Sequence, residues 1–223
     1  VLFRSYTLQS KIALTMTAAL ILIPGLFFFF FELDPSTSLS EHFLISFFQS
    51  VTTRTAGYNT IDIKDFSETG RAALIALMLI GGSPGSTAGG IKTTTAFTLF
   101  AIMIATFRLK KDPTCFSRRL SSETQRHAVT ILMMYLLLFA SGSVLLNLID
   151  GIRLIDSAFE TASALGTVGL SIGVTDDLGP LSKYVMMLLM FFGRIGGLTV
   201  IFAAHAHSRQ DSGRSPEERI TIG

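Results

Sequence analysis

The chain has 223 residues, of which 49% are hydrophobic and only 15% are charged, with a formal net charge of +2. Soluble domains carry about 25% charged residues, so this composition argues against an ordinary soluble enzyme. The small net charge gives no support for nucleic-acid binding, and the single cysteine, Cys115, excludes a disulfide framework within the chain.

Four apolar segments are long enough to cross a membrane, because about 20 apolar residues span a hydrocarbon core of roughly 30 Å. The first three contain no charged residue, and the fourth contains only Arg194. They are residues 12–31, 72–91, 128–149 and 184–204. The sequence therefore predicts an all-α polytopic membrane protein surrounded by membrane lipid.

The charges between these segments predict the orientation of the chain. Residues 108–126 carry six Lys or Arg against two Asp or Glu, and both ends are also basic, whereas the other connections are acidic. The positive-inside rule places both termini and the basic linker in the cytoplasm. We expect two membrane units, residues 1–107 and 128–204, joined by the linker 108–127 and followed by a cytoplasmic tail, 205–223.

A shift of 112 positions aligns the sequence with itself. "FFQSVTTRTAGYN" (residues 47–59) falls on "FETASALGTVGLS" (residues 159–171), and residues 71–85 fall on 183–197 without a gap. Thr55 then meets Thr167, and Gly57 meets Gly169. This fixed offset predicts two tandem repeats.

Each repeat has a spanning helix, a short amphipathic stretch, a Thr-x-Gly tripeptide and a second spanning helix. The short stretches, about 40–53 and 156–165, cannot cross a bilayer and must therefore dip in and return. Ser40 and Asp156 are the expected N-caps of these half-helices, whose negative carboxyl ends would face the membrane centre and attract a cation. Helix, re-entrant loop and helix is the plan of a potassium-channel pore.

The residues beyond each half-helix are the expected filter, because backbone carbonyls there can replace the hydration shell of a potassium ion. Gly57 and Gly169 permit positive φ angles at these places. The predicted ion-binding residues are Thr55, Ala56, Gly57 and Tyr58, and Thr167, Val168, Gly169 and Leu170.

The stretch "GGSPGSTAGGIKTTT" (residues 81–95) interrupts an apolar helix. Residues 71–107 as one straight helix would be about 55 Å long, so we expect a break in mid-membrane. Gly85 and Gly90 have the spacing of a phosphate-binding P-loop, but Ile91 intervenes before Lys92 and no strand precedes the motif, which argues against nucleotide binding.

Lys92 and Arg194 are cationic residues in predicted intramembrane segments, where charge usually marks function. Arg194 is expected to face the pore below the filter, hydrogen-bond carbonyls of the glycine-rich stretch and repel cations; a purely structural tie between helices is the alternative. Lys92 has a similar pair of interpretations, and its alternative is that the long side chain reaches toward the cytoplasmic side. Arg54 is expected to point behind the filter, and Glu160 to pair with an unidentified donor.

The motifs "FQSVTTRTAGYNTIDI", "GGSPGSTAGGIKTTT", "GTVGLSIGVT" and "FFGRIGGLTV" resemble the Trk/Ktr/HKT superfamily of potassium transporters, and most of all its Ktr-type membrane subunit. The resemblance implies four such repeats around one pore, of which this chain supplies the third and fourth. It also implies a homodimer, a cytosolic ring of nucleotide-binding regulatory subunits and, in many members, a response to sodium. No cofactor is expected in this chain, with potassium as its substrate.

The resemblance identifies the glycine-rich break as an intramembrane gating loop, with Arg194 beneath the filter. The implied gate residues are Gly81, Gly82, Ser83, Pro84, Gly85, Ser86, Thr87, Ala88, Gly89, Gly90, Lys92, Thr93 and Thr94, together with Arg194.

Two departures accompany this resemblance. Gly197 stands where the family pattern has proline. Half of the pore is also absent, so we expect missing N-terminal repeats of the same subunit, with the assembly of two such chains as the alternative. The leading expectation is potassium uptake. The alternatives are a sodium-permeable transporter and a non-conducting fragment or scaffold; nothing in the sequence favours an enzyme.

Overall fold

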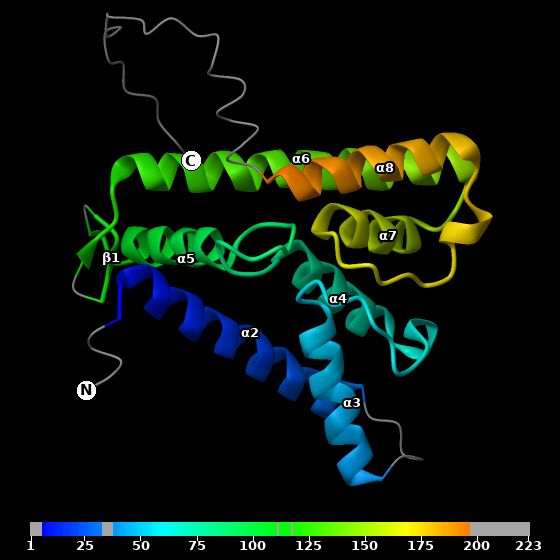
Figure 1. Ribbon diagram of the computed structural model, residues 1–223, viewed down its shortest axis with the longest axis horizontal. Helices are drawn as coiled ribbons and strands as arrows, with labels where there is room; N and C mark the ends of the chain where they lie inside the picture. Colours follow the sequence, from blue (N-terminus) through cyan, green and yellow to red (C-terminus); the bar gives the residue numbers. More distant parts are fainter. Residues whose placement is uncertain (1–5, 33–37, 111, 117, 197–223) are drawn as a thin grey trace, which may run out of the picture.

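The computed structural model describes residues 6–32, 38–110, 112–116 and 118–196. Apart from two strands of two residues each, the regular structure in these ranges is helical, in agreement with the expected class. Figure 1 shows the elements, which in chain order are α2 (Leu8–Phe31), α3 (Leu39–Thr52), η1 (Ile63–Asp65), α4 (Glu68–Leu79), α5 (Thr93–Phe107), β1 (Thr114–Cys115), β2 (Arg118–Arg119), α6 (Ser122–Asp150), α7 (Leu154–Gly166), η2 (Thr175–Asp177) and α8 (Pro180–Ile195).

Two helices of the described chain, α2 and α6, are long and apolar enough to cross a membrane. They have 24 and 29 residues, which correspond to lengths of about 36 and 44 Å. Ser121 caps α6 by accepting the Thr124 N–H at 3.2 Å, so this helix starts before the apolar run that predicted it. Gly151, with a φ of 69°, ends α6 in the left-handed conformation typical of helix C-termini.

Helices α3 and α7 are short, with 14 and 13 residues. Their lengths of about 20 Å are less than the thickness of the hydrocarbon core. Each is followed by one of the Thr-x-Gly tripeptides. The structure thus contains the predicted non-spanning helices at the predicted places.

The predicted N-caps of these short helices are wrong. Ser38 caps α3, and Ser40 lies inside the first turn. Arg153 precedes α7 and makes no side-chain cap. Asp156 lies in the first turn of α7, where its carboxylate is engaged by Arg71 of α4 at 3.4 Å. An acidic side chain in this turn still interacts favourably with the helix dipole.

Helix α7 packs against α4, α6 and α8, and Figure 1 shows it between α4 and the α6–α8 pair. Two buried hydrophobic clusters meet on this helix. The first joins it to α2, α4 and the segment after α7 through Phe28, Ile63, Phe66, Leu74, Ile75, Met78, Phe159, Ala162, Val168, Leu170 and Ile172. The second joins it to α6 and α8 through Ile91, Ile131, Tyr135, Leu146, Ala164, Leu165, Leu178, Met186 and Leu189. α7 is therefore held on several sides.

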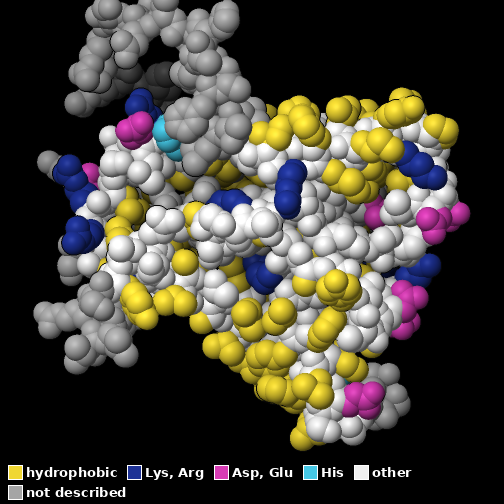
Figure 2. Space-filling model, in the orientation of Figure 1, with side chains coloured by type: hydrophobic (Ala, Val, Ile, Leu, Met, Phe, Trp, Pro, Cys, Tyr) yellow, Lys and Arg dark blue, Asp and Glu magenta, His cyan; other side chains and the backbone are white. Residues whose placement is uncertain are grey.

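The surface separates charged ends from apolar flanks. In Figure 2 the basic side chains of the linker gather at the left end, and most of the visible acidic side chains lie at the opposite end. Many large apolar side chains between these ends are exposed, including Ile23 at 68% and Leu137 at 67%. This pattern suits a molecule whose flanks face lipid.

Candidate functional site

The first Thr-x-Gly segment, Thr55–Tyr58, follows α3. Gly57 has a φ of 76°, which confirms the predicted positive angle. Thr55 is also left-handed, with a φ of 67°, which the sequence did not predict; a side chain in this conformation is strained by about 1–2 kcal/mol. Ala56 is exposed and Tyr58 is 73% exposed, so this segment lies at the surface of the described chain.

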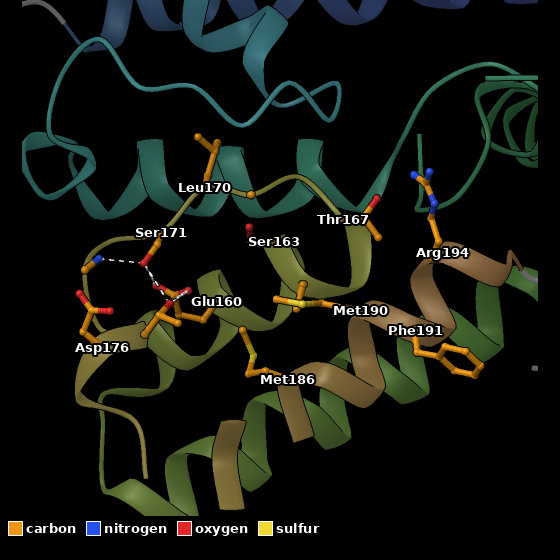
Figure 3. Close-up of a pocket in the computed structure, with 14 residues that line it drawn as sticks. Glu160, Ser163, Thr167, Leu170, Ser171, Asp176, Met186, Met190, Phe191 and Arg194 are labelled. Carbon is orange, nitrogen blue, oxygen red and sulfur yellow. Dashed lines mark hydrogen bonds between the residues drawn. The ribbon is translucent and has the colours of Figure 1, made fainter. Parts of the chain in front are cut away.

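The second segment, Thr167–Leu170, repeats this conformation at the end of α7. Thr167 has a φ of 52° and Gly169 a φ of 94°. Val168 and Leu170 are buried in the first hydrophobic cluster. Thr167 and Gly169 line a cavity of about 830 Å³, part of which is drawn in Figure 3. Val168 is therefore enclosed by the cluster, whereas Leu170 is buried in the cluster and also borders the cavity.

The structure brings the two segments together at their glycines. A Cβ atom built on Gly57 would collide with the Val168 carbonyl oxygen and lie 3.3 Å from the Gly169 Cα. A Cβ built on Gly169 would lie 3.6 Å from the Gly57 Cα. The backbone of one segment thus lies directly against that of the other, and the contact leaves no room for a side chain at Gly57.

The carboxyl end of α7 points at the second segment, because α7 ends at Gly166 and Thr167 follows at once. The partial negative charge of a helix C-terminus is concentrated in its last turn. A Cβ on Gly166 would collide with the Met78 carbonyl, so the ends of α7 and α4 are in contact. The end of α7 can therefore stabilise a cation next to the second segment.

The glycine-rich stretch forms a loop between α4 and α5, as predicted. Backbone hydrogen bonds close its base: Gly81 N–H donates to the Ile91 carbonyl at 2.9 Å, Ile91 N–H to Leu79 at 3.0 Å and Thr93 N–H to Gly82 at 3.1 Å. These bonds pair amides and carbonyls that the interrupted helix leaves free, which is needed at membrane depth. Thr93 and Thr94 begin α5.

The loop touches the second segment at one glycine. Gly89 N–H donates to Thr167 Oγ1 at 3.0 Å. A Cβ on Gly89 would collide with that hydroxyl and lie 3.0 Å from the Gly166 carbonyl. Gly81, Gly89 and Gly90 are buried, while Gly85, Ser86 and Thr87 are exposed. The stretch therefore has a packed base and an exposed tip.

Two cations hold consecutive carbonyls near this tip. Arg194 of α8 donates from Nη1 to the Thr87 carbonyl, and Lys92 donates from Nζ to the Ala88 carbonyl. The predicted contact between Arg194 and the glycine-rich stretch is thus present. Arg194 thus connects the loop to α8, and Lys92 connects it to the start of α5.

Arg54 lies beside the first segment but contacts α4. Its Nη2 donates to the Leu77 carbonyl at 2.5 Å and to Thr53 Oγ1 at 3.3 Å. The guanidinium thus neutralises part of the carboxyl end of α4, next to the helix break. This agrees with the expectation that Arg54 points away from the filter carbonyls.

Sequence reasoning missed three features of the site: the left-handed threonines, the contact of Gly89 with Thr167, and the donors to Glu160. The equal offset of Thr55 and Thr167 was a signal that both positions share a special role. The other two contacts join residues of different segments, and no local pattern indicated them. Gly197 and the tail 205–223 lie outside the described residues.

The chain is similar to known cation transport proteins. The family model TrkH, described as a cation transport protein, matches residues 3–214. The crystal structure of the potassium transporter TrkH from Vibrio parahaemolyticus superposes with a TM-score of 0.70 at 21% identity, covering 87% of this chain and 43% of that one. This likeness shows a common polytopic membrane fold.

Curated relatives are more similar in sequence. The potassium/sodium uptake protein NtpJ of Enterococcus hirae is 38% identical over 99% of this chain and 51% of its own length. The Ktr system potassium uptake protein D of Bacillus subtilis is 35% identical over 98% of this chain and 49% of its own length. The chain thus spans about half the length of these relatives. It belongs to the TrkH family of cation transport proteins, a family of transporters and not of enzymes.

Proposed function

We propose that the chain forms part of the ion-conducting subunit of a Ktr/Trk-type potassium uptake system in the cell membrane. Residues 55–58 and 167–170 supply two walls of a carbonyl-lined filter. The other two walls come from N-terminal repeats of the same subunit. Potassium moves inward with the membrane potential, which is worth about 2.3 kcal/mol per charge per 100 mV.

One observation carries the proposal: two segments with the same left-handed Thr and Gly meet backbone to backbone at the ends of non-spanning helices. Left-handed residues redirect peptide units, so successive carbonyls can face a common axis. Rings of such carbonyls are the ligands that dehydrate and select a potassium ion. The dipole of α7 adds attraction for a cation at the inner end.

The glycine-rich loop is the proposed gate. It contacts Thr167 at the start of the second segment and is held by Arg194 and Lys92. Their two positive charges oppose the passage of a cation, and the exposed tip at Gly85–Thr87 offers little packing that would resist displacement. Release of the loop from Thr167 and Arg194 would open the inner end of the path.

The proposed assembly follows the family. The subunit forms a homodimer and binds a cytosolic ring of nucleotide-binding regulatory subunits. Sodium dependence of uptake is part of the same proposal. The names of the Ktr-system relatives support this placement.

Rubidium uptake into liposomes that contain potassium tests the proposal. The complete gene product that contains these residues is expected to take up rubidium, and Gly57→Asp is expected to abolish uptake without loss of the folded protein. Wild-type protein that folds but shows no flux above empty liposomes would overturn the proposal.

A second candidate is permeation of sodium, because the Enterococcus hirae relative is named for both ions. Competition by external ions during rubidium uptake distinguishes potassium selectivity from sodium permeation. Excess external potassium should suppress rubidium uptake strongly and excess sodium weakly if the filter selects potassium. Equal suppression by the two ions would favour the sodium-permeable alternative.

A further inference from the structure

Glu160 is a buried acidic residue on α7, beside the proposed filter. Its side chain is 1% exposed and lies near the middle of the helix. None of the ion pairs among the described residues includes it. Burial of a carboxylate is costly unless hydrogen bonds compensate for the lost water, so the partners of Glu160 indicate what it holds.

All partners of this carboxylate lie just after the second Thr-x-Gly segment. Oε1 accepts the Ser171 hydroxyl at 2.7 Å and the Ile172 N–H at 3.0 Å. Oε2 accepts the Thr175 hydroxyl at 2.7 Å. Figure 3 shows Ser171 directed at Glu160 on the cavity side of α7. One side chain thus fastens both ends of residues 171–175 to the half-helix.

The fastened segment is closed on itself as well. Gly173 N–H donates to Ser171 Oγ at 2.9 Å, and the Ser171 and Thr175 hydroxyls lie 3.1 Å apart. We name Glu160, Ser171, Ile172 and Thr175 the carboxylate bracket. Three donors thus converge on one carboxyl group, and the bracket holds residues 171–175 at both ends.

The bracket fixes the register of the filter segment that precedes it. Val168, Leu170 and Ile172 are buried, and Thr167, Gly169, Leu170 and Ser171 line the cavity. The hydrogen bonds of Glu160 to Ser171 and the Ile172 amide hold the end of the segment, and the buried side chains of Val168 and Leu170 hold its middle.

The first Thr-x-Gly segment is held by a different set of hydrogen bonds. Thr52, which is 1% exposed, accepts the Tyr58 N–H at 2.9 Å and donates to the Tyr58 carbonyl at 2.6 Å. At the repeat offset, Phe48 stands where Glu160 does, and Ala164 stands where Thr52 does. A neutral hydroxyl thus closes the first segment, and a carboxylate closes the second.

We propose that Glu160 is a positioning residue for ion selectivity. It holds residues 171–175, and thereby keeps the carbonyls of residues 167–170 at the spacing that suits potassium. A loosened segment could close around the smaller sodium ion. The selectivity part rests on the proposed function, whereas the mechanical part concerns only the fold.

The experiment uses the complete gene product that contains this chain, with Glu160→Ala, Glu160→Gln and Thr175→Ala. Thr175→Ala removes one arm of the bracket without changing the charge, and Glu160→Gln removes the charge but keeps an acceptor for the Ile172 amide. Asp177→Asn is the control, because Asp177 is an exposed acidic residue nearby that makes no side-chain contact with the bracket.

Two measurements test the mechanical part and the selectivity part of the proposal separately. Amide hydrogen exchange of residues 168–176 should quicken in Thr175→Ala and most in Glu160→Ala, with Asp177→Asn unchanged. The preference for rubidium over sodium should fall roughly tenfold in Glu160→Ala, since displacements of about 1 Å at a binding site have effects of that order or larger. The preference for rubidium over sodium in Thr175→Ala and Glu160→Gln should lie between the values for Glu160→Ala and wild type.

Folded variants with wild-type exchange would overturn the bracket, whatever the transport result. Faster exchange with unchanged selectivity would overturn the selectivity role alone. Absence of rubidium uptake by the wild type would instead reject the proposed function. If Glu160→Ala does not accumulate, Thr175→Ala and Glu160→Gln decide the same questions, because they retain most of the bracket.

Discussion

Gly57 and Gly169 lie against each other across the two halves of the chain, although 112 residues separate them in sequence. A Cβ on Gly169 would be 3.6 Å from the Gly57 Cα, and both residues have positive φ angles, 76° and 94°. The two positions nevertheless differ in their surroundings. Gly57 faces the Val168 carbonyl at a distance that admits no side chain, whereas Gly169 has room for a methyl group.

This difference predicts unequal effects of the same substitution. Gly169→Ala should meet mainly the conformational strain of a positive φ, about 1–2 kcal/mol, and retain part of its rubidium uptake. Gly57→Ala should also displace the Val168 carbonyl and lose nearly all uptake. Uptake and thermal stability of both variants in detergent would be measured together. Equal loss in both would show that the contact across the segments has no functional role.

The contact between Gly89 and Thr167 predicts a variant with a weakened gate. Gly89→Ala should push the loop away from the second segment, because the added methyl group would collide with the threonine hydroxyl. Loss of this hydrogen bond is worth about 1 kcal/mol, so initial uptake should rise roughly fivefold. Gly85→Ala adds the strain of a side chain at a φ of 85° but meets no neighbouring atom, and it should raise uptake less. Lower uptake in Gly89→Ala would contradict a closed loop.

Substitution of Arg194 is a second way to raise rubidium uptake. Arg194→Gln removes the positive charge but keeps a donor for the Thr87 carbonyl, and Arg194→Lys keeps the charge but not the planar guanidinium. If charge opposes cations below the filter, uptake should rise in the Gln variant and change little in the Lys variant. Rates in liposomes at equal protein content would show this. A rise only in the Lys variant would mean that the geometry of the guanidinium, and not the charge, restrains the ion.

Two ion pairs join α4 to the first turn of α7 and to the residue before it, and they predict different contributions to stability. Arg71 and Asp156 are 3.4 Å apart with side chains only 14% and 16% exposed, whereas Arg153 and Glu68 are 2.9 Å apart but 64% and 74% exposed. Double-mutant cycles to alanine should give a coupling of about 1–2 kcal/mol for the first pair and less than about 1 kcal/mol for the second. Thermal unfolding in detergent measures both. A larger coupling for the exposed pair would contradict the packing of these helices.

Cys115 tests the orientation of the chain. A membrane-impermeant maleimide should reach this thiol from the cytoplasmic side only, because it lies in the basic linker. Burial raises the pKa of the Cys115 thiol, so less thiolate is present at neutral pH than for a free cysteine. Labelling should therefore be slow at pH 7 and accelerate as the pH rises towards the pKa. Rapid labelling from outside the cell would invert the proposed topology.

The elements that the sequence predicted well are those set by local composition. Helices α2 and α6 follow from uninterrupted apolar runs, and the break between α4 and α5 follows from glycines in a helix too long for the membrane. The positive φ angles of Gly57 and Gly169 follow from residue type. Even the contact of Arg194 with the loop was predictable, because an intramembrane charge needs a polar partner.

The features that the sequence did not predict depend on tertiary packing. Ser38 and Ser40 are equally good caps by residue type, and the choice between them depends on where the chain enters the helix. Thr55 and Thr167 adopt left-handed angles that threonine avoids, so only the surrounding contacts can impose them. The donors to Glu160 lie 11 to 15 residues away in sequence and reach it through the fold of the cavity wall.

The central claim is that potassium passes between the two Thr-x-Gly segments, and the most direct test is to locate the ion. Crystals of the complete gene product, grown in rubidium, would be measured at the rubidium absorption edge. If potassium passes between the two segments, anomalous peaks are expected within coordination distance of the carbonyls of residues 55–58 and 167–170. Rubidium bound elsewhere, with none between these segments, would contradict it.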